Sequence, residues 1–174
     1  ILGDLLGMYA VGSGAEWYKG TDYNDPAQQE KMKESVRQMV NEYKDEPYVL
    51  MWMLGNESNY GEVGDPKKEK VGTGSQARYQ PEALYKFVNE VAGMIKQMDP
   101  SHLVGFSNGD MLFVDALAKH SDHIDIFGTN SYRGAAGFGR SFWEAARDHM
   151  DKPVLLTEYG CPAYFAGKDL AFAE

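Results

Sequence analysis

Two long stretches of the chain carry apolar residues at helical spacing, with polar and charged residues between them. The first stretch contains Met32, Val36, Met39, Val40 and Tyr43. Asp25-Pro26 predicts its start, because aspartate caps a helix and proline fits the first helical position. The second stretch follows Pro81, continues through residues 84–98 and is ended by Asp99-Pro100. Weaker patterns predict two further helices at residues 112–119 and 141–150.

Short apolar runs of strand length lie between these helices. They cover residues 7–11, 48–54, 103–106, 124–128 and 153–157. Runs that are apolar on nearly every residue are typical of parallel strands buried on both faces. Because strands and helices alternate along the chain, we expect an α/β domain with a parallel sheet.

The connections differ in length according to their direction. Those that follow strands are long and rich in Gly, Asn, Ser and aromatic residues, as at 56–80 and 129–140. Those that precede strands are short, as at 44–47 and 99–102. In a (β/α)₈ barrel, and also in an open doubly wound sheet, the active site lies at the carboxyl ends of the strands. We therefore expect function in the residues directly after each strand.

Composition excludes several classes of partner. A formal net charge of −9 argues against nucleic acid, whose phosphates require basic patches. No apolar run reaches the roughly 20 residues that span a bilayer. Cys161 is the only cysteine, so no internal disulfide can form. The N-terminal residues lack a signal-peptide pattern, although we expect a parent protein that is secreted or periplasmic.

Two glutamates come directly after predicted strands: Glu57 follows the run at 48–54, and Glu158 follows the run at 153–157. A carboxylate beside a buried apolar strand is costly unless it has a partner or a chemical role. Two carboxylates on neighbouring loops of one face are what glycoside hydrolysis requires. The alternative is that each glutamate caps the next helix or pairs with an arginine, and the spacing alone leaves both interpretations open.

Three segments in register resemble one known family. WMLGNE at residues 52–57 is similar to the W-x-x-G-N-E signature of the (β/α)₈ glycoside hydrolases of clan A, especially family 2. PVLLTEYG at 153–160 resembles the seventh strand of that barrel, and DIFGTNSY at 125–132 resembles the sixth. The resemblance implies a TIM barrel in which Glu57 is the acid/base and Glu158 is the nucleophile. It further implies that Asn56 binds the sugar 2-hydroxyl and that Tyr132 donates to Glu158.

The implied activity is hydrolysis of β-linked glycosides in oligo- or polysaccharides, through a covalent glycosyl-enzyme and without a cofactor. Glu57 would then have to stay protonated at working pH, in an apolar or electrostatically unfavourable pocket. Two alternatives remain: transglycosylation on β-glucans, in which a sugar hydroxyl replaces water, and a non-catalytic carbohydrate-binding fragment. Each has a carbohydrate as its partner, with neither nucleic acid nor a membrane.

Four further residues are candidates for substrate binding. Asn108 and Asp110 follow the strand at 103–106, where they could contact substrate hydroxyls or simply form an Asn-Gly-Asp turn. Glu16 and Trp17 follow the run at 7–11, where the clan often places sugar-binding groups. His120 and His123 are spaced i, i+3 without a third ligand type nearby, so we predict a helix end and no metal site.

The resemblance covers nearly the whole chain but only part of a barrel. A complete (β/α)₈ barrel takes about 250 residues, and this chain has 174. If 48–54 is the fourth strand, residues 7–11 form the third and 153–157 the seventh. The first two strands and the eighth are then absent, and we expect the remaining barrel segment, or another chain, to close the sheet. We also expect the isolated chain to be weakly active or inactive.

Overall fold

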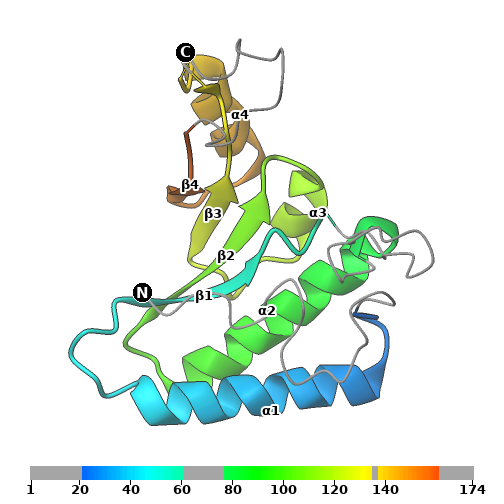
Figure 1. Cartoon of the computed structure of the whole chain (residues 1–174), viewed down its shortest axis with the longest axis vertical. Helices are drawn as coiled ribbons and strands as arrows, with labels where there is room; N and C mark the ends of the chain where they lie inside the picture. The colour runs from blue at the N-terminus through cyan, green and yellow to red at the C-terminus, as the bar shows by residue number, and fades with distance from the viewer. Residues whose placement is uncertain (1–20, 61–76, 135–136, 161–174) are drawn as a thin grey trace, which may run out of the picture.

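A computed structural model describes residues 21–60, 77–134 and 137–160 (Figure 1). Its centre is a sheet of four strands in the order β1-β2-β3-β4, and every neighbouring pair is parallel. The strands are β1 (Met51–Asn56), β2 (Leu103–Gly109), β3 (Ile126–Asn130) and β4 (Val154–Glu158). Because every pair is parallel, the carboxyl ends of all four strands lie at one edge of the sheet.

Helices α2 (Pro81–Met98), α3 (Val114–Lys119) and α4 (Arg140–His149) connect these strands in turn, and helix α1 (Pro26–Tyr43) precedes β1. A short 3₁₀ turn η1 (Ala77–Tyr79) lies before α2. Asp25 caps α1, as its side chain accepts from the backbone N–H of Ala27 at 2.8 Å. Figure 1 shows α1 beside α2, with α2 between α1 and the sheet. Among the described residues, no helix has the length and apolar character needed to cross a bilayer.

The two faces of the sheet bury different side chains. Trp52 and Leu54 of β1, Val104 and Phe106 of β2, and Phe127 of β3 join the helices in the larger apolar core. The opposite face carries a small cluster of Met51, Met53, Ile126 and Leu155. On that face, a Cβ added at Gly128 would lie 2.7 Å from the Phe106 carbonyl oxygen and 2.8 Å from Met53 Cε. Glycine therefore makes room for the Met53 side chain across the sheet.

The strands confirm the predicted order but shift the predicted ends. The strand predicted at 48–54 begins too early, because Tyr48 and Leu50 are exposed and strand pairing begins at Met51. At their carboxyl ends, the strands extend past the apolar runs into polar residues, which pair with the neighbouring strand. The predicted strand at 7–11, together with Glu16, Trp17 and Cys161, lies outside the described residues.

Candidate active site

β1, which Glu57 follows, and β4, which ends in Glu158, each carry an irregularity just before their last residue. In β1 the pairing passes from Leu54 to Asn56 and omits Gly55; in β4 it passes from Leu156 to Glu158 and omits Thr157. A bulge of this kind re-aims the side chain that follows it. Gly55 has φ +65, and a Cβ there would lie 2.7 Å from Phe106 Cε2, so the turn requires glycine. The two bulges place Asn56 opposite Ser107 and Glu158 opposite Asn130.

Glu57 leaves the end of β1 in a left-handed conformation, with φ +54. That conformation costs a non-glycine residue about 1–2 kcal/mol. It is held because the Glu57 N–H donates to the Ser107 carbonyl at 3.1 Å and the Glu57 carbonyl accepts from Tyr60 at 3.0 Å. Burial raises the pKa of the Glu57 carboxyl, a hydrogen bond from Asn130 lowers it, and the charge of Glu158 raises it further. The net upward direction favours a protonated carboxyl at this position.

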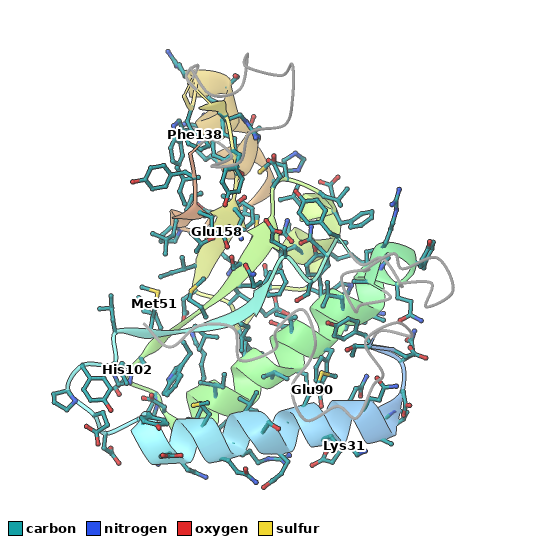
Figure 2. The ribbon with its side chains drawn as sticks, viewed as in Figure 1. Lys31, Met51, Glu90, His102, Phe138 and Glu158 are labelled. Carbon is teal, nitrogen blue, oxygen red and sulfur yellow. The ribbon has the colours of Figure 1, made fainter. Side chains whose placement is uncertain are left out.

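Glu158 ends β4 and accepts a hydrogen bond from Tyr132. The Tyr132 hydroxyl donates to Glu158 Oε2 at 2.6 Å, which is the contact that the family resemblance implied. This bond is the largest cause that raises the pKa of Tyr132 to about 12; burial and the charges of Glu158 and Glu57 add to it. Figure 2 shows Glu158 at the opposite end of the sheet from His102, which precedes β2. The two glutamates therefore share the carboxyl edge of the sheet.

Asn130, which is 1% exposed, links the strands beneath these carboxylates. Its Oδ1 accepts from Ser107 Oγ at 2.9 Å and from Thr157 Oγ1 at 2.6 Å. Its Nδ2 donates to Asn56 Oδ1 at 2.9 Å, and its side chain also bonds Glu57. Asn130 thus fixes groups on β1, β2 and β4. It stood in the DIFGTNSY segment, but sequence reasoning did not single it out as a site residue.

Asn108 and Asp110 lie at the same edge, yet their side chains are engaged within the protein. Asn108 is fully buried: its Oδ1 accepts from the Tyr85 hydroxyl at 2.7 Å, and its Nδ2 donates to the Asp110 carbonyl at 2.8 Å. Asp110 forms a bidentate ion pair with Arg133. These contacts favour the turn over the predicted contact of Asn108 with substrate. They also show Arg133 as a neighbour of the site that the sequence pattern did not indicate.

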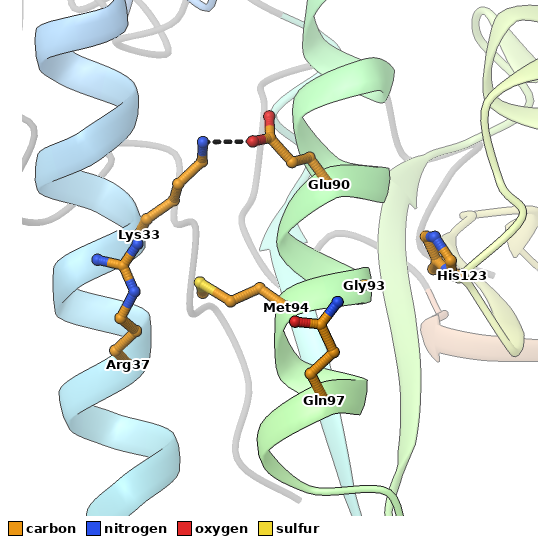
Figure 3. Close-up of a pocket in the computed structure, with 7 residues that line it drawn as sticks. All are labelled: Lys33, Arg37, Glu90, Gly93, Met94, Gln97 and His123. Atoms are coloured by element: carbon orange, nitrogen blue, oxygen red, sulfur yellow. Dashed lines mark hydrogen bonds and ion pairs between the residues drawn. The ribbon is translucent and has the colours of Figure 1, made fainter.

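A hollow of about 360 Å³ is bordered by residues of α1 and α2 and by His123, which precedes β3 (Figure 3). It is lined by Lys33, Arg37, Glu90, Gly93, Met94, Gln97 and His123. Lys33 pairs with Glu90 at 2.5 Å, and the His123 ring packs against Gly93. His120 pairs with Glu82. The charged groups Lys33 and Glu90 of this hollow are thus paired with each other.

Comparison with known proteins gives a family match over most of the chain. The family described as "Glycosyl hydrolases family 2, TIM barrel domain" matches residues 7–168. A curated relative, the probable mannan endo-1,4-β-mannosidase C of Aspergillus terreus, is 31% identical over 99 residues, 57% of this chain and 23% of that protein. Mannan endo-1,4-β-mannosidase 1 of Solanum lycopersicum is 23% identical over 79% of this chain and 41% of its own length. The chain spans less than half of either relative.

Solved structures share the fold at lower identity. The endo-β-1,4-mannanase of Thermotoga petrophila aligns with a TM-score of 0.58 and 20% identity, over 84% of this chain and 38% of that one. The β-D-glucuronidase of Dictyoglomus thermophilum aligns with a TM-score of 0.55 and 18% identity, over 83% of this chain and 23% of that one. With the parallel sheet, these likenesses confirm the predicted fold, part of a (β/α)₈ barrel.

Proposed function

The chain belongs to the TIM-barrel domain family of the family 2 glycosyl hydrolases, and from this membership we propose that this domain, once its barrel is closed, hydrolyses β-linked glycosides with retention of configuration. Glu57 is the acid/base and Glu158 is the nucleophile. The observation that carries the proposal is the contrast between their surroundings. Burial and the charge of Glu158 raise the pKa of Glu57, whereas Glu158 accepts a 2.6 Å hydrogen bond from Tyr132. One environment favours a proton donor and the other an oriented carboxylate.

In the first step, the glycosidic bond breaks and an ester forms. Glu57 gives its proton to the leaving oxygen while Glu158 attacks the anomeric carbon. Tyr132 holds Oε2 of Glu158, so Oε1 is the oxygen that attacks. The leaving alcohol departs with the proton, and the sugar stays bound to Glu158 as a covalent ester.

In the second step, the same carboxyl group works as a base. Esterification removes the negative charge of Glu158, and that charge is one of the causes that raise the pKa of Glu57. The pKa of Glu57 therefore falls in the intermediate, and the ionised carboxylate takes a proton from an incoming water. Water attacks the anomeric carbon, the ester bond breaks, and Glu158 returns as a free carboxylate.

Asn56 is the sugar-binding group nearest the acid/base. Because its Oδ1 accepts from Asn130, its amide NH₂ is the end that can donate to a substrate hydroxyl. A donor here fits the sugar 2-hydroxyl, where hydrogen bonds strengthen in the transition state. Asn130 thus sets the direction in which Asn56 presents its donor.

The substrate class follows from the relatives as well as from the site. The curated relatives named above are mannan endo-1,4-β-mannosidases, so β-1,4-mannan is the first polymer to test. Aryl β-mannosides and aryl β-glucuronides are the matching small substrates, since β-glucuronidases share the fold. The two carboxylates act on the glycosidic bond itself, whereas the sugar is selected by other parts of the site.

The test is proton NMR of the anomeric signal during hydrolysis by the intact protein. We expect the β-anomer to appear first and to mutarotate later. First appearance of the α-anomer would contradict the covalent intermediate. Formation of a new glycoside in place of the free sugar would indicate transglycosylation.

Glu57→Ala should slow the hydrolysis of substrates with poor leaving groups far more than that of activated aryl glycosides, and added azide should restore the rate. Glu42→Ala, on the polar face of α1, is the matched control.

A further inference from the structure

Arg133 and Asp110 form a bidentate ion pair at the carboxyl edge of the sheet. Arg133 Nη1 donates to Asp110 Oδ2 and Nη2 donates to Asp110 Oδ1, each at 2.7 Å. Two parallel bonds of this kind fix geometry as well as charge. About a third of each side chain is exposed, so the pair lies at the surface of the site and not in the core. The steps proposed above use neither residue.

Asp110 is anchored to the ends of two strands. It follows β2 in a left-handed conformation, with φ +48, which a non-glycine residue adopts only when its surroundings hold it. Its N–H donates to the Asn130 carbonyl at 2.9 Å, and its Oδ1 also accepts from Met111 N at 3.0 Å and from Ser131 Oγ at 3.2 Å. These hydrogen bonds hold the Asp110 side chain in one position beside the end of β3.

Arg133 is the residue directly after Tyr132. Its Nη1 also donates to the Tyr132 carbonyl at 3.2 Å, and its guanidinium lies 5.2 Å from the centre of the Phe142 ring on α4. On the other side of Tyr132, the Ser131 N–H donates to the Glu158 carbonyl at 2.9 Å. Tyr132 itself is 47% exposed, so little apolar packing holds its ring. Its position therefore depends on the backbone contacts of its two neighbours.

We infer that the Asp110–Arg133 pair is a positioning device that holds the Tyr132 hydroxyl on Glu158. The inference rests on the proposed function, because it deepens the account of how the nucleophile is oriented. A direct role of Arg133 in binding a substrate carboxylate fits less well, since Asp110 occupies both of its terminal nitrogens. The pair acts through Tyr132 and does not touch the reacting atoms.

The pKa of the Tyr132 phenol reports on this device without any need for turnover. The hydrogen bond to Glu158 is the main reason that this pKa stands at about 12. A phenol released from Glu158 would titrate near its ordinary value of about 10. Loss of the Arg133 cation by itself would have the opposite effect, because a nearby positive charge favours phenolate. A fall in the pKa of Tyr132 after removal of Arg133 therefore identifies release from Glu158.

The first experiment is an NMR titration of the intact protein with ring-labelled tyrosine, in which Tyr132→Phe assigns the signal. We expect Tyr132 to remain mostly protonated at pH 11 in the wild type and to be mostly ionised there in Arg133→Met. Asp110→Asn should also lower this pKa, but loss of its negative charge favours phenolate by itself, so Arg133→Met is the deciding variant. Arg140→Met breaks the exposed Arg140–Glu144 pair on α4 and should leave Tyr132 unchanged. An unchanged or higher pKa of Tyr132 in Arg133→Met would overturn the inference.

The second experiment is a double-mutant cycle on the turnover number. Arg133→Met and Tyr132→Phe should each lower kcat by about 10- to 100-fold, as expected for a misplaced reacting group, with little change in KM. The double variant should be no slower than Tyr132→Phe alone, because both changes remove the same contact. Losses that multiply would show that Arg133 acts independently of Tyr132. If the wild type hydrolyses no glycoside while the Tyr132 titration shifts as expected, the proposed function fails and the positioning contact stands.

Discussion

The side-chain nitrogen of Asn130 lies 2.9 Å from the side-chain oxygen of Asn56, although β2 separates their strands. This contact ties the end of β3 to the residue that precedes Glu57, the proposed acid/base. The Asn130 side-chain oxygen accepts from the hydroxyls of Ser107 and Thr157, so β2 and β4 together determine the orientation of this amide. The carboxyl edge of the sheet is therefore a connected polar layer.

Asn130→Ala should lower kcat by roughly 10- to 100-fold, because Asn56 and Glu57 lose the group that orients them. It should also move the alkaline limb of the kcat/KM profile to higher pH. The sign follows from the hydrogen bond that Asn130 gives Glu57, which lowers the pKa of that carboxyl. Without the bond the pKa rises, and the acid keeps its proton to higher pH. A pH–rate profile measures both effects.

Asn89→Ala is the matched control for that experiment. Asn89 on α2 accepts from the His123 N–H at 2.8 Å, so its loss removes one asparagine contact on the helical side of the sheet. Its kcat and its alkaline limb should match the wild type. An alkaline limb that moves to lower pH in Asn130→Ala would show that the amide does not stabilise the ionised form of Glu57.

Glu57→Gln should abolish turnover of poor leaving groups and yet stabilise the fold at neutral pH. The folded state raises the pKa of Glu57, so folding opposes the ionised form and wild-type stability falls as pH rises through that window. Neutral glutamine avoids this cost. We expect a Tm gain of roughly 1–3 °C at pH 7, kept small because partial exposure screens the charge. The gain should vanish below the ordinary glutamate pKa; a gain that persists there would have another cause.

The helices follow closely from the sequence because their signals are local. Apolar spacing, Asp25-Pro26, Pro81 and Asp99-Pro100 bracket α1 and α2 as the structure has them. The strand ends do not follow so closely. Tyr48 and Leu50 are apolar but precede the paired segment, whereas Ser107 and Asn130 are polar and lie within it. Pairing and hydrogen bonding between distant segments decide such ends, and no local periodicity reports them.

The same distinction applies to the site. Glu57, Glu158, Asn56 and Tyr132 stand in motifs that can be read along the chain. The contact between Asn130 and Asn56 joins residues 74 positions apart, and the Arg133–Asp110 pair depends on a left-handed turn after β2. Only the folded sheet brings those partners together, so sequence patterns give the proposed reacting groups without the residues that contact them.

Asp99 should carry much of the acid sensitivity of this domain. It is 3% exposed and accepts from Trp52 Nε1 at 2.8 Å. Burial raises the pKa of Asp99, but hydrogen bonds from Ser101, Trp52 and His102 outweigh it and lower the pKa to about 2. Because the folded value lies below the unfolded one, the stabilisation is present above pH ~4 and is lost as pH falls towards 2, on the order of 2 kcal/mol.

Asp99→Asn should therefore cost about 1–3 kcal/mol at pH 7 and flatten the loss of stability between pH 4 and 2. Urea unfolding at several pH values measures both effects. Asp148→Asn is the control, since the Asp148 side chain is 71% exposed and should change stability little at any pH. An acid transition in Asp99→Asn as steep as that of the wild type would place the sensitivity elsewhere.

The most direct test of the account is to trap the covalent intermediate. A 2-deoxy-2-fluoro-β-glycosyl fluoride of an accepted sugar should inactivate the intact protein by forming a stable ester. Peptide mass spectrometry should then find the sugar on Glu158, and Glu158→Gln should remain unlabelled. Glu57→Ala should still be labelled, because the fluoride leaving group needs little protonation. A sugar attached to another carboxylate while Glu158 stays free would contradict the assignment of the nucleophile.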